Sequence, residues 1–324
     1  MGLNKKSHLR KIDGLLLIDK PKGLSSAQVV AKVKGIFKAQ KAGHTGSLDP
    51  LASGLLPIIL GQATKFSSFF LEGAKTYEAE GRLGITTTSQ DAEGEIVREV
   101  DPHDAYLKLP SVLQEFRGDL IQTPSVYSAI KVNGKPLYKY ARSNREVEVP
   151  SRNISIMELT LIYSDRNTFK IRVHCSKGTY IRTLVHDIGQ RLNVGAHVIS
   201  LRRIGIDALT GPMYTLDELQ KIKDAGDDDA FSKLDAHIIS TDSALGYLPS
   251  IHLSKKESIM LCQGQSLKIA LEPVLPFLEK DRTQIFRLYY ETLFLGLGHF
   301  NDQNFLCCVR MMSDPMQTNP NSHS

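Results

Sequence analysis

The sequence of 324 residues contains no tryptophan and only four cysteines. The cysteines show no CxxC spacing, and Cys307 and Cys308 are adjacent, so we expect free thiols rather than a disulfide framework or zinc ligands. No apolar run approaches the roughly 20 residues that a membrane-spanning helix needs. The apolar segment LLLI (15–18) is too short for the core of a secretory signal. The absences together predict a cytoplasmic protein with free thiols.

Positive charge is concentrated in two separate blocks of the sequence. The formal net charge is +5, but residues 1–45 carry ten Lys or Arg against two Asp, and residues 166–205 carry eight against Asp187 alone. Residues 250–324 carry seven charges of each sign and are neutral. Clustered cations on a nearly neutral protein suggest a polyanionic partner, most simply a nucleic acid. A solvated basic face is the ordinary alternative for either block taken alone.

The hydrophobic patterns predict strands and helices without a regular βαβ period. Residues 76–83 alternate strictly, which places Tyr77 on the core-facing side of a strand. Ser25 and Gln28 form the pattern of a capping box at the start of a helix. Further strands are expected at 14–19, 95–99, 155–163, 168–175 and 196–207, and further helices near 104–116 and at 179–192. This mixture favours an α+β fold over a doubly wound sheet.

The sequence also suggests a division into domains. Leu248-Pro249 is the best boundary, because an acidic connection (223–236) precedes it and a small β-rich module comes after it. We therefore expect a catalytic domain at 11–247 and a second domain at 250–312. Residues 1–10 and 313–324 are polar and are expected to form flexible tails.

The run GHTGSLDPLASG (43–54) places one carboxylate, Asp49, in a turn rich in glycine. An apolar segment lies directly after it at 55–60, and a carboxylate against such a wall is a candidate nucleophile or base. An acid directly before a proline is also typical of a helix N-cap. Capping a helix would require none of the features around Asp49, namely His44, the three glycines and the basic residues that precede the run. The context therefore favours a chemical role for Asp49.

Other residues are candidate partners of that carboxylate. Arg182 lies one turn into a predicted helix, and an arginine beside a buried carboxylate favours its ionised form, although a lone helical arginine is usually a surface residue. Tyr77 could stack on a base or move a proton, or simply pack in the core. Tyr127 and Lys131 combine an aromatic ring and a cation as single-stranded RNA sites do, or they lie on an amphipathic surface. No second histidine stands at ligand spacing near His44, so a metal role is not expected.

Six ordered motifs between Gly14 and Ile206 together resemble the TruB family of tRNA pseudouridine synthases. They are LLLIDKPKGLSS (15–26), KAGHTGSLDPLASGLLPI (41–58), ATKFS with KTYEAEGRLG (63–84), PSVYSAIKVNGKPLYKYAR (124–142), CSKGTYIRTLVHDIG (175–189) and GAHVISLRRIGI (195–206). The resemblance implies a pseudouridine synthase fold, with a central mixed, mainly antiparallel sheet flanked by helices and loops. It also implies a PUA-like RNA-binding domain after residue 250.

The resemblance also implies an activity and the residues that perform it. The family breaks the C1′–N1 bond of the uridine at position 55 in the tRNA T loop, rotates the uracil and rejoins it through C5, without a cofactor or metal. Its catalytic aspartate, stacking tyrosine and paired arginine fall on Asp49, Tyr77 and Arg182. The residue that fills the space of the flipped nucleotide matches His44. The two residues that line the uracil pocket match Tyr180 and Leu201, and a motif lysine near the site matches Lys20. The expected partner is the T-arm of tRNA, and the expected state is a monomer.

Three other interpretations remain open at this point. The chain could bind or fold tRNA without turnover, although Asp49, Tyr77 and Arg182 are all present. It could be a related guide-RNA-dependent synthase, but it lacks the long basic extensions expected there. A nucleoside or glycoside hydrolase would require a second catalytic carboxylate, which the sequence does not place.

Overall fold

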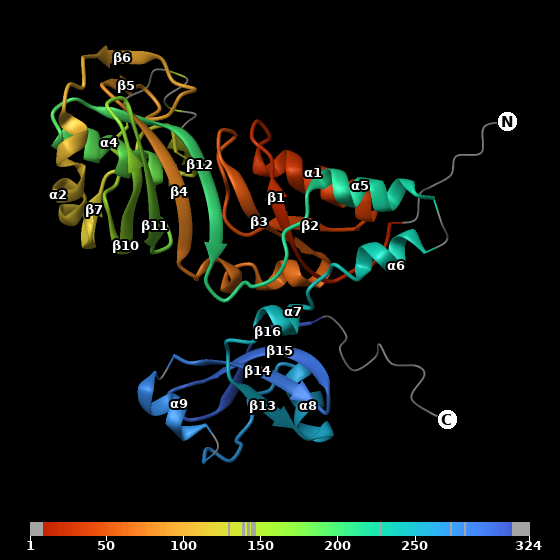
Figure 1. The fold of residues 1–324 in the computed structure, drawn as a ribbon. Coiled ribbons are helices and arrows are strands. Elements are labelled where there is room, and N and C mark those ends of the chain that lie inside the picture. Colours follow the sequence, from red (N-terminus) through yellow and green to blue (C-terminus); the bar gives the residue numbers. More distant parts are fainter. Residues whose placement is uncertain are drawn as a thin grey trace.

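The computed structural model describes residues 9–312 except 129, 138–139, 141–142, 144–146, 227–228, 273 and 282. An eight-stranded sheet forms the larger part of the molecule (Figure 1). The strand order is β1 (Gly14–Lys20), β3 (Ser53–Leu60), β12 (Ala196–Ile206), β4 (Lys75–Leu83), β11 (Thr168–Cys175), β10 (Arg152–Ser164) and β7 (Gly118–Gln122), and β2 (Ala42–His44) pairs with β3. Strands β12 and β3 run parallel, and the other pairs are antiparallel. The expected α+β fold with a mixed, mainly antiparallel sheet is confirmed.

Helices cover the sheet in two groups (Figure 1). Near β1, α1 (Ser26–Phe37) packs with α5 (Leu216–Asp224), which in turn contacts α6 (Ala230–Asp235). Farther along the sheet, α4 (Ile181–Arg191) packs on β12 and β4. The predicted capping box is present, because the Ser25 hydroxyl accepts a hydrogen bond from Gln28 N and the Gln28 side chain accepts one from Ser25 N.

The helix expected near 104–116 is broken into three short pieces. A 3₁₀ turn (Ala105–Lys108) is followed by α2 (Leu109–Val112) and by a second 3₁₀ turn (Leu113–Phe116). Pro110 lies at the start of α2, and because proline has no backbone N–H it cannot donate the hydrogen bond that would continue an α-helix from the preceding turn. The pieces still bury Leu109 and Leu113, which explains the helix-like apolar spacing of the segment.

Strand β4 has the predicted alternation. Ala79, Gly81 and Leu83 are buried, Arg82 is exposed, and Tyr77 is partly buried against the core. Two hairpins and two further 3₁₀ turns are described around the sheet: β5 (Ile85–Thr87) with β6 (Ile96–Glu99), β8 (Lys131–Val132) with β9 (Lys135–Pro136), and the turns Gly61–Phe66 and Phe69–Leu71. Residue Tyr77 therefore lies on a central strand, on the same side as the core residues.

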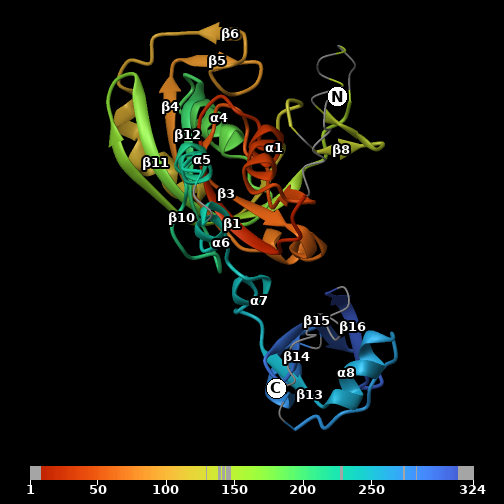
Figure 2. The ribbon, with the colours of Figure 1, turned by 90° about the vertical axis from the view of Figure 1, so that its right-hand side faces the viewer.

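A smaller part of the chain comes after α7 (Thr241–Ala244) and forms its own sheet at one end of the molecule (Figure 2). The order of its strands is β13 (Ser250–Leu253), β14 (Ile285–Tyr290), β15 (Leu293–Phe300) and β16 (Leu306–Met311), with α8 (Lys255–Cys262) and α9 (Leu275–Lys280) beside them. It encloses an apolar cluster around Phe286 and Leu288, while Leu297 packs into a second cluster with Leu15 and Phe66 of the larger part. We propose domains at 11–247 and 250–312. The predicted tails at 1–10 and 313–324 lie mostly outside the described residues.

The described part of the chain contains no helix that is both long and apolar enough to cross a membrane.

Candidate functional site

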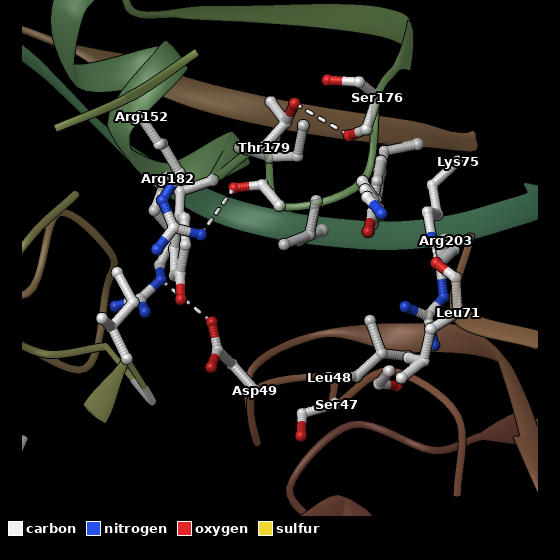
Figure 3. Close-up of a pocket in the computed structure, with 18 of the residues that line it drawn as sticks. Ser47, Leu48, Asp49, Leu71, Lys75, Arg152, Ser176, Thr179, Arg182 and Arg203 are labelled. Atoms are coloured by element: carbon white, nitrogen blue, oxygen red, sulfur yellow. Dashed lines mark hydrogen bonds and ion pairs between the residues drawn. The ribbon is translucent and has the colours of Figure 1, made fainter. Parts of the chain in front are cut away.

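A cavity of about 880 Å³ opens beside Asp49 (Figure 3). The loop at 46–49, strand β4, strand β12 and the segment at 176–182 all contribute to its wall. Besides Asp49, five of the residues predicted for the site line it, four of which are Tyr77, Tyr180, Arg182 and Leu201. Lys131 lines it as well, whereas Lys20, His44 and Tyr127 are not among its lining residues.

Asp49 and Arg182 meet at the mouth of this cavity. Arg182 Nε lies 2.9 Å from Asp49 Oδ2. The Arg182 side chain is 6% exposed, whereas that of Asp49 is 45% exposed. The arginine is therefore fixed inside the protein and holds a carboxylate that a ligand in the cavity can reach.

The structure excludes helix capping, the alternative role of Asp49, and corrects one expectation about its loop. Asp49 caps no helix: its carbonyl accepts a hydrogen bond from Ala52 N, and strand β3 begins directly afterwards at Ser53. The apolar wall expected at 55–60 does not line the cavity, because these residues are buried in the core on the two faces of β3. Both differences arise because the chain after Pro50 enters the central sheet rather than a helix.

Arg182 is held from the other side by a carboxylate that the sequence did not reveal. Its Nη1 lies 3.1 Å from Asp91 Oδ2, and the Asp91 side chain is 5% exposed. The same nitrogen donates to Ser89 O at 2.8 Å, and Nη2 donates to Tyr127 O at 2.9 Å. Arg182 thus bridges a buried and an accessible carboxylate. Tyr127, predicted as an RNA contact, supplies a backbone acceptor in this network.

Lys20 stabilises the Asp49 loop through hydrogen bonds to its backbone. Its side chain is buried, and Nζ donates to the carbonyl oxygens of Ala52 at 2.7 Å, Pro21 at 3.0 Å and Pro50 at 3.4 Å. Burial lowers the pKa of Lys20 to about 8, against the opposing attraction of Asp49. The lysine predicted to lie near the site therefore joins the segment after β1 to the turn that carries Asp49.

Tyr77, Tyr180 and Leu201 form the part of the wall suited to a flat ring. Burial raises the pKa of Tyr77, although the neighbouring Arg203 guanidinium opposes this shift. Tyr180 is fixed by Gln122, whose side-chain amide accepts from Tyr180 N at 2.8 Å and donates to Tyr180 O at 3.0 Å. The Arg152 guanidinium lies 5.4 Å from the centre of the Tyr180 ring. Gln122 thus fixes the backbone of Tyr180, and both aromatic rings line the cavity wall.

His44 lies on β2, where it pairs with Ile58 of β3. Burial and, to a smaller extent, the charge of Arg203 lower the pKa of His44, so the neutral imidazole is favoured. Its Nδ1 is buried and has no hydrogen-bond partner in the described part of the chain. Among the described residues, no group of three or more His, Cys, Asp or Glu side chains could hold a metal ion.

Four cations of the cavity wall were not predicted from the sequence: Lys75, Arg152, Lys177 and Arg203. Strict alternation along β4 places Lys75 on the same face as Tyr77, so the sequence held a signal for this residue. Arg203 is 1% exposed, and nothing in LRRI (201–204) distinguishes it from Arg202. The arrangement as a whole is a partly open cavity with two aromatic rings, several cations and two accessible carboxylates, of which Asp49 is paired with the buried Arg182 and Glu72 with the exposed Lys177.

Two family models match the chain. The one described as "TruB family pseudouridylate synthase (N terminal domain)" matches residues 34–181. The one described as "tRNA pseudouridylate synthase B C-terminal domain" matches residues 182–246. The two matches are contiguous and include the Asp49 loop, β4, β12 and α4.

Curated proteins named "tRNA pseudouridine synthase B" resemble the chain over most of its length. One from Haemophilus influenzae (strain PittEE) is 44% identical over 290 residues, which cover 89% of this chain and 92% of that protein. Another, from Actinobacillus succinogenes (strain ATCC 55618), is 42% identical over 314 residues, covering 97% of this chain and 98% of that protein.

Solved structures with lower sequence identity share the fold. "Structure of H/ACA RNP bound to a substrate RNA containing 2'-deoxyuridine" gives a TM-score of 0.65 at 23% identity and covers 92% of this chain and 84% of that chain. "Crystal structure of the archaeal box H/ACA sRNP Nop10-Cbf5 complex" gives the same score and identity, covering 94% and 86%. At these identities the likeness concerns the fold alone.

Proposed function

The chain belongs to the TruB family of pseudouridylate synthases, and we propose that it converts the uridine at position 55 in the T loop of tRNA to pseudouridine. The observation that carries the proposal is the accessible carboxylate of Asp49, which Arg182 holds at 2.9 Å beside a cavity with aromatic walls. The family membership and the named relatives support tRNA as the substrate. The position within the T loop rests on the resemblance of the six motifs.

The proposed reaction is an isomerisation in which Asp49 is the nucleophile. It attacks either C1′ of the ribose or C6 of the uracil, the C1′–N1 bond breaks, and the uracil rotates within the cavity. A bond then forms between C1′ and C5, and the bond to Asp49 breaks. C5 gives up its proton and N1 takes one up, so the product is an isomer of the substrate. Arg182 orients the carboxylate through its contact with Asp49 Oδ2, while Tyr77 stacks on the base and assists the removal of the C5 proton. No electron is gained or lost overall, so the reaction needs no redox partner.

The cavity suits a base that has left its stack. A uridine inside folded RNA is inaccessible to Asp49, so the nucleotide must be extruded at a cost of a few kcal/mol. We propose that Tyr180 and Leu201 hold the uracil, which must stay in place between cleavage and rejoining. His44 fills the space that the nucleotide leaves, and its lowered pKa favours a neutral ring there. Lys20 contributes by fixing the loop that carries Asp49.

Phosphate contacts are proposed for the basic block at 1–45, where Lys22 and Lys41 are exposed. Replacing both with glutamine is expected to weaken tRNA binding and to lower the slope of log affinity against log salt by roughly 0.7–0.9 for each lost contact. Binding measured over a series of salt concentrations tests this. A matched control replaces Arg98 and Lys108, two exposed cations outside both blocks, and should leave the slope unchanged. An unchanged slope in the Lys22 and Lys41 variant would exclude these two residues from phosphate contact.

The activity itself is tested with an unmodified tRNA transcript and with a bare T-arm stem-loop. Incubation with the purified chain, followed by nuclease digestion and mass-spectrometric mapping, should show pseudouridine at position 55 in both RNAs. Tight binding without product would instead identify a tRNA-binding or folding protein. Product that appears only after a guide RNA is added would identify a guide-RNA-dependent synthase. Release of free uracil would identify a hydrolase. Sedimentation of the free chain tests the expected monomer.

A further inference from the structure

Arg203 is a buried cation without a carboxylate partner in the described part of the chain. Its side chain is 1% exposed, Nε donates to Leu55 O at 2.7 Å, and Nη2 donates to Gly46 O at 3.0 Å. Neutral carbonyl oxygens therefore accept some of the hydrogen bonds of the guanidinium but do not neutralise its charge. An uncompensated buried charge is costly, and its presence beside a cavity indicates a role there.

A second buried cation, Lys75, faces the same end of the cavity. It is 7% exposed, and Nζ donates to the carbonyl oxygens of Leu71 and Gly73. Burial lowers the pKa of Lys75, and the charge of Arg203 lowers it further, whereas Glu72 opposes the shift. Glu72 itself forms an ion pair with Lys177. The fold therefore brings two cations together although their positive charges repel each other.

Lys75 and Arg203 lie across the cavity from Asp49. Figure 3 shows Lys75 and Arg203 on one side of the cavity and the Asp49–Arg182 pair on the other. Arg203 of β12 is paired in register with Tyr77 of β4, and Lys75 lies two residues before Tyr77 on the same face. A base seated between Asp49 and Tyr77 would therefore have the two cations at its far side.

We propose that Lys75 and Arg203 stabilise the negative charge that develops on the uracil during the reaction. This inference rests on the function proposed above. If Asp49 attacks C1′, the electron pair of the C1′–N1 bond stays on the base and spreads from N1 to O2 and O4. If Asp49 attacks C6, the electron pair of the C5–C6 double bond moves toward C5 and O4. Both routes place an anion on the base before C5 bonds to C1′, and fixed cations lower the barrier to its formation.

The test compares two T-arm stem-loops, one with uridine and one with 5-fluorouridine at the target position. Fluorine withdraws electrons and stabilises an anionic uracil, so the fluorinated base depends less on the protein's cations. The single-turnover rate at saturating enzyme, followed as loss of the unmodified target nucleoside, separates chemistry from binding. The variants are Lys75→Met, Arg203→Met and the charge-conserving Lys75→Arg and Arg203→Lys. Arg82→Met, which removes an exposed cation of β4 outside the cavity, is the matched control.

On uridine, each methionine variant is expected to react about 100-fold more slowly, and each charge-conserving variant within about tenfold of the wild type. On 5-fluorouridine, the losses of the methionine variants should shrink to about tenfold. If a variant of Arg203 does not fold, Lys75→Met decides the question alone. An equal loss on both substrates, or a loss below about threefold, would overturn the inference and leave the cations a structural role. Failure of the wild type on the uridine stem-loop would instead contradict the proposed function.

Discussion

Replacing Asp49 with asparagine is expected to abolish pseudouridine formation while tRNA binding persists. Asparagine keeps the size of the side chain and can still accept a hydrogen bond from Arg182 Nε, which lies 2.9 Å from Asp49 Oδ2. It cannot act as the nucleophile, so we expect turnover to fall by at least about 10⁴-fold. The affinity for tRNA should stay within about tenfold, or roughly 1.4 kcal/mol. Single-turnover assays and filter binding on the same preparation measure both quantities.

Glu78→Gln is a suitable control for this experiment. Glu78 is also a carboxylate paired with an arginine, Arg172, and it lies next to Tyr77 on β4 but points away from the cavity. Its replacement should leave turnover within a few-fold of the wild type. Turnover by Asp49→Asn at a rate near that of the control would contradict a nucleophilic role for Asp49. A collapse of tRNA binding in Asp49→Asn would indicate that this side chain mainly organises the loop.

The sequence of the Asp49 loop predicts the turn but not the element that comes after it. The glycines and the proline predicted a turn that carries a carboxylate buried against an apolar wall. The structure has the turn, but the expected burial is wrong, because the Asp49 side chain is 45% exposed. Local patterns could not decide which element comes after the turn, because an acid before proline is compatible with both a helix start and a strand. The choice depends on pairing of β3 with β1 and β12, which are distant in the sequence. The apolar residues at 55–60, which directly follow the turn in the sequence, therefore belong to the core rather than to the cavity wall.

Two side chains show why other parts of the site could not be predicted. Arg202 and Arg203 are adjacent on β12, yet Arg202 reaches outward to Asp19 at 2.7 Å while Arg203 is buried. Irregularities in register on either side of them make simple alternation unreliable for this strand. Asp91 lies in a polar turn that resembles an exposed loop. Asp91 is nevertheless buried, because the turn is fixed against β12 by hydrogen bonds from Ala92 N to Val198 O and from Val198 N to Gln90 O.

Asp91 gives the second prediction with a large expected effect. Asp91→Ala removes the buried partner of Arg182, which then keeps only the half-exposed Asp49 as a charged partner. Breaking a buried ion pair from one side costs about 3–5 kcal/mol of stability, because the remaining charge stays buried without compensation. Turnover should also fall, since an arginine that is no longer fixed cannot hold Asp49 in place. Urea denaturation and single-turnover assays at a temperature where the variant is folded measure the two effects.

Asp101→Ala is the matched control, because it removes an exposed carboxylate that pairs with Arg166 far from the cavity. Its denaturation midpoint and its turnover should both match the wild type, as expected for a surface ion pair. If Asp91→Ala loses stability but keeps full turnover, Arg182 does not need its buried partner to orient Asp49. If it loses neither, the ion pair to Asp91 is not what fixes Arg182, and the hydrogen bonds to Ser89 O and Tyr127 O must suffice.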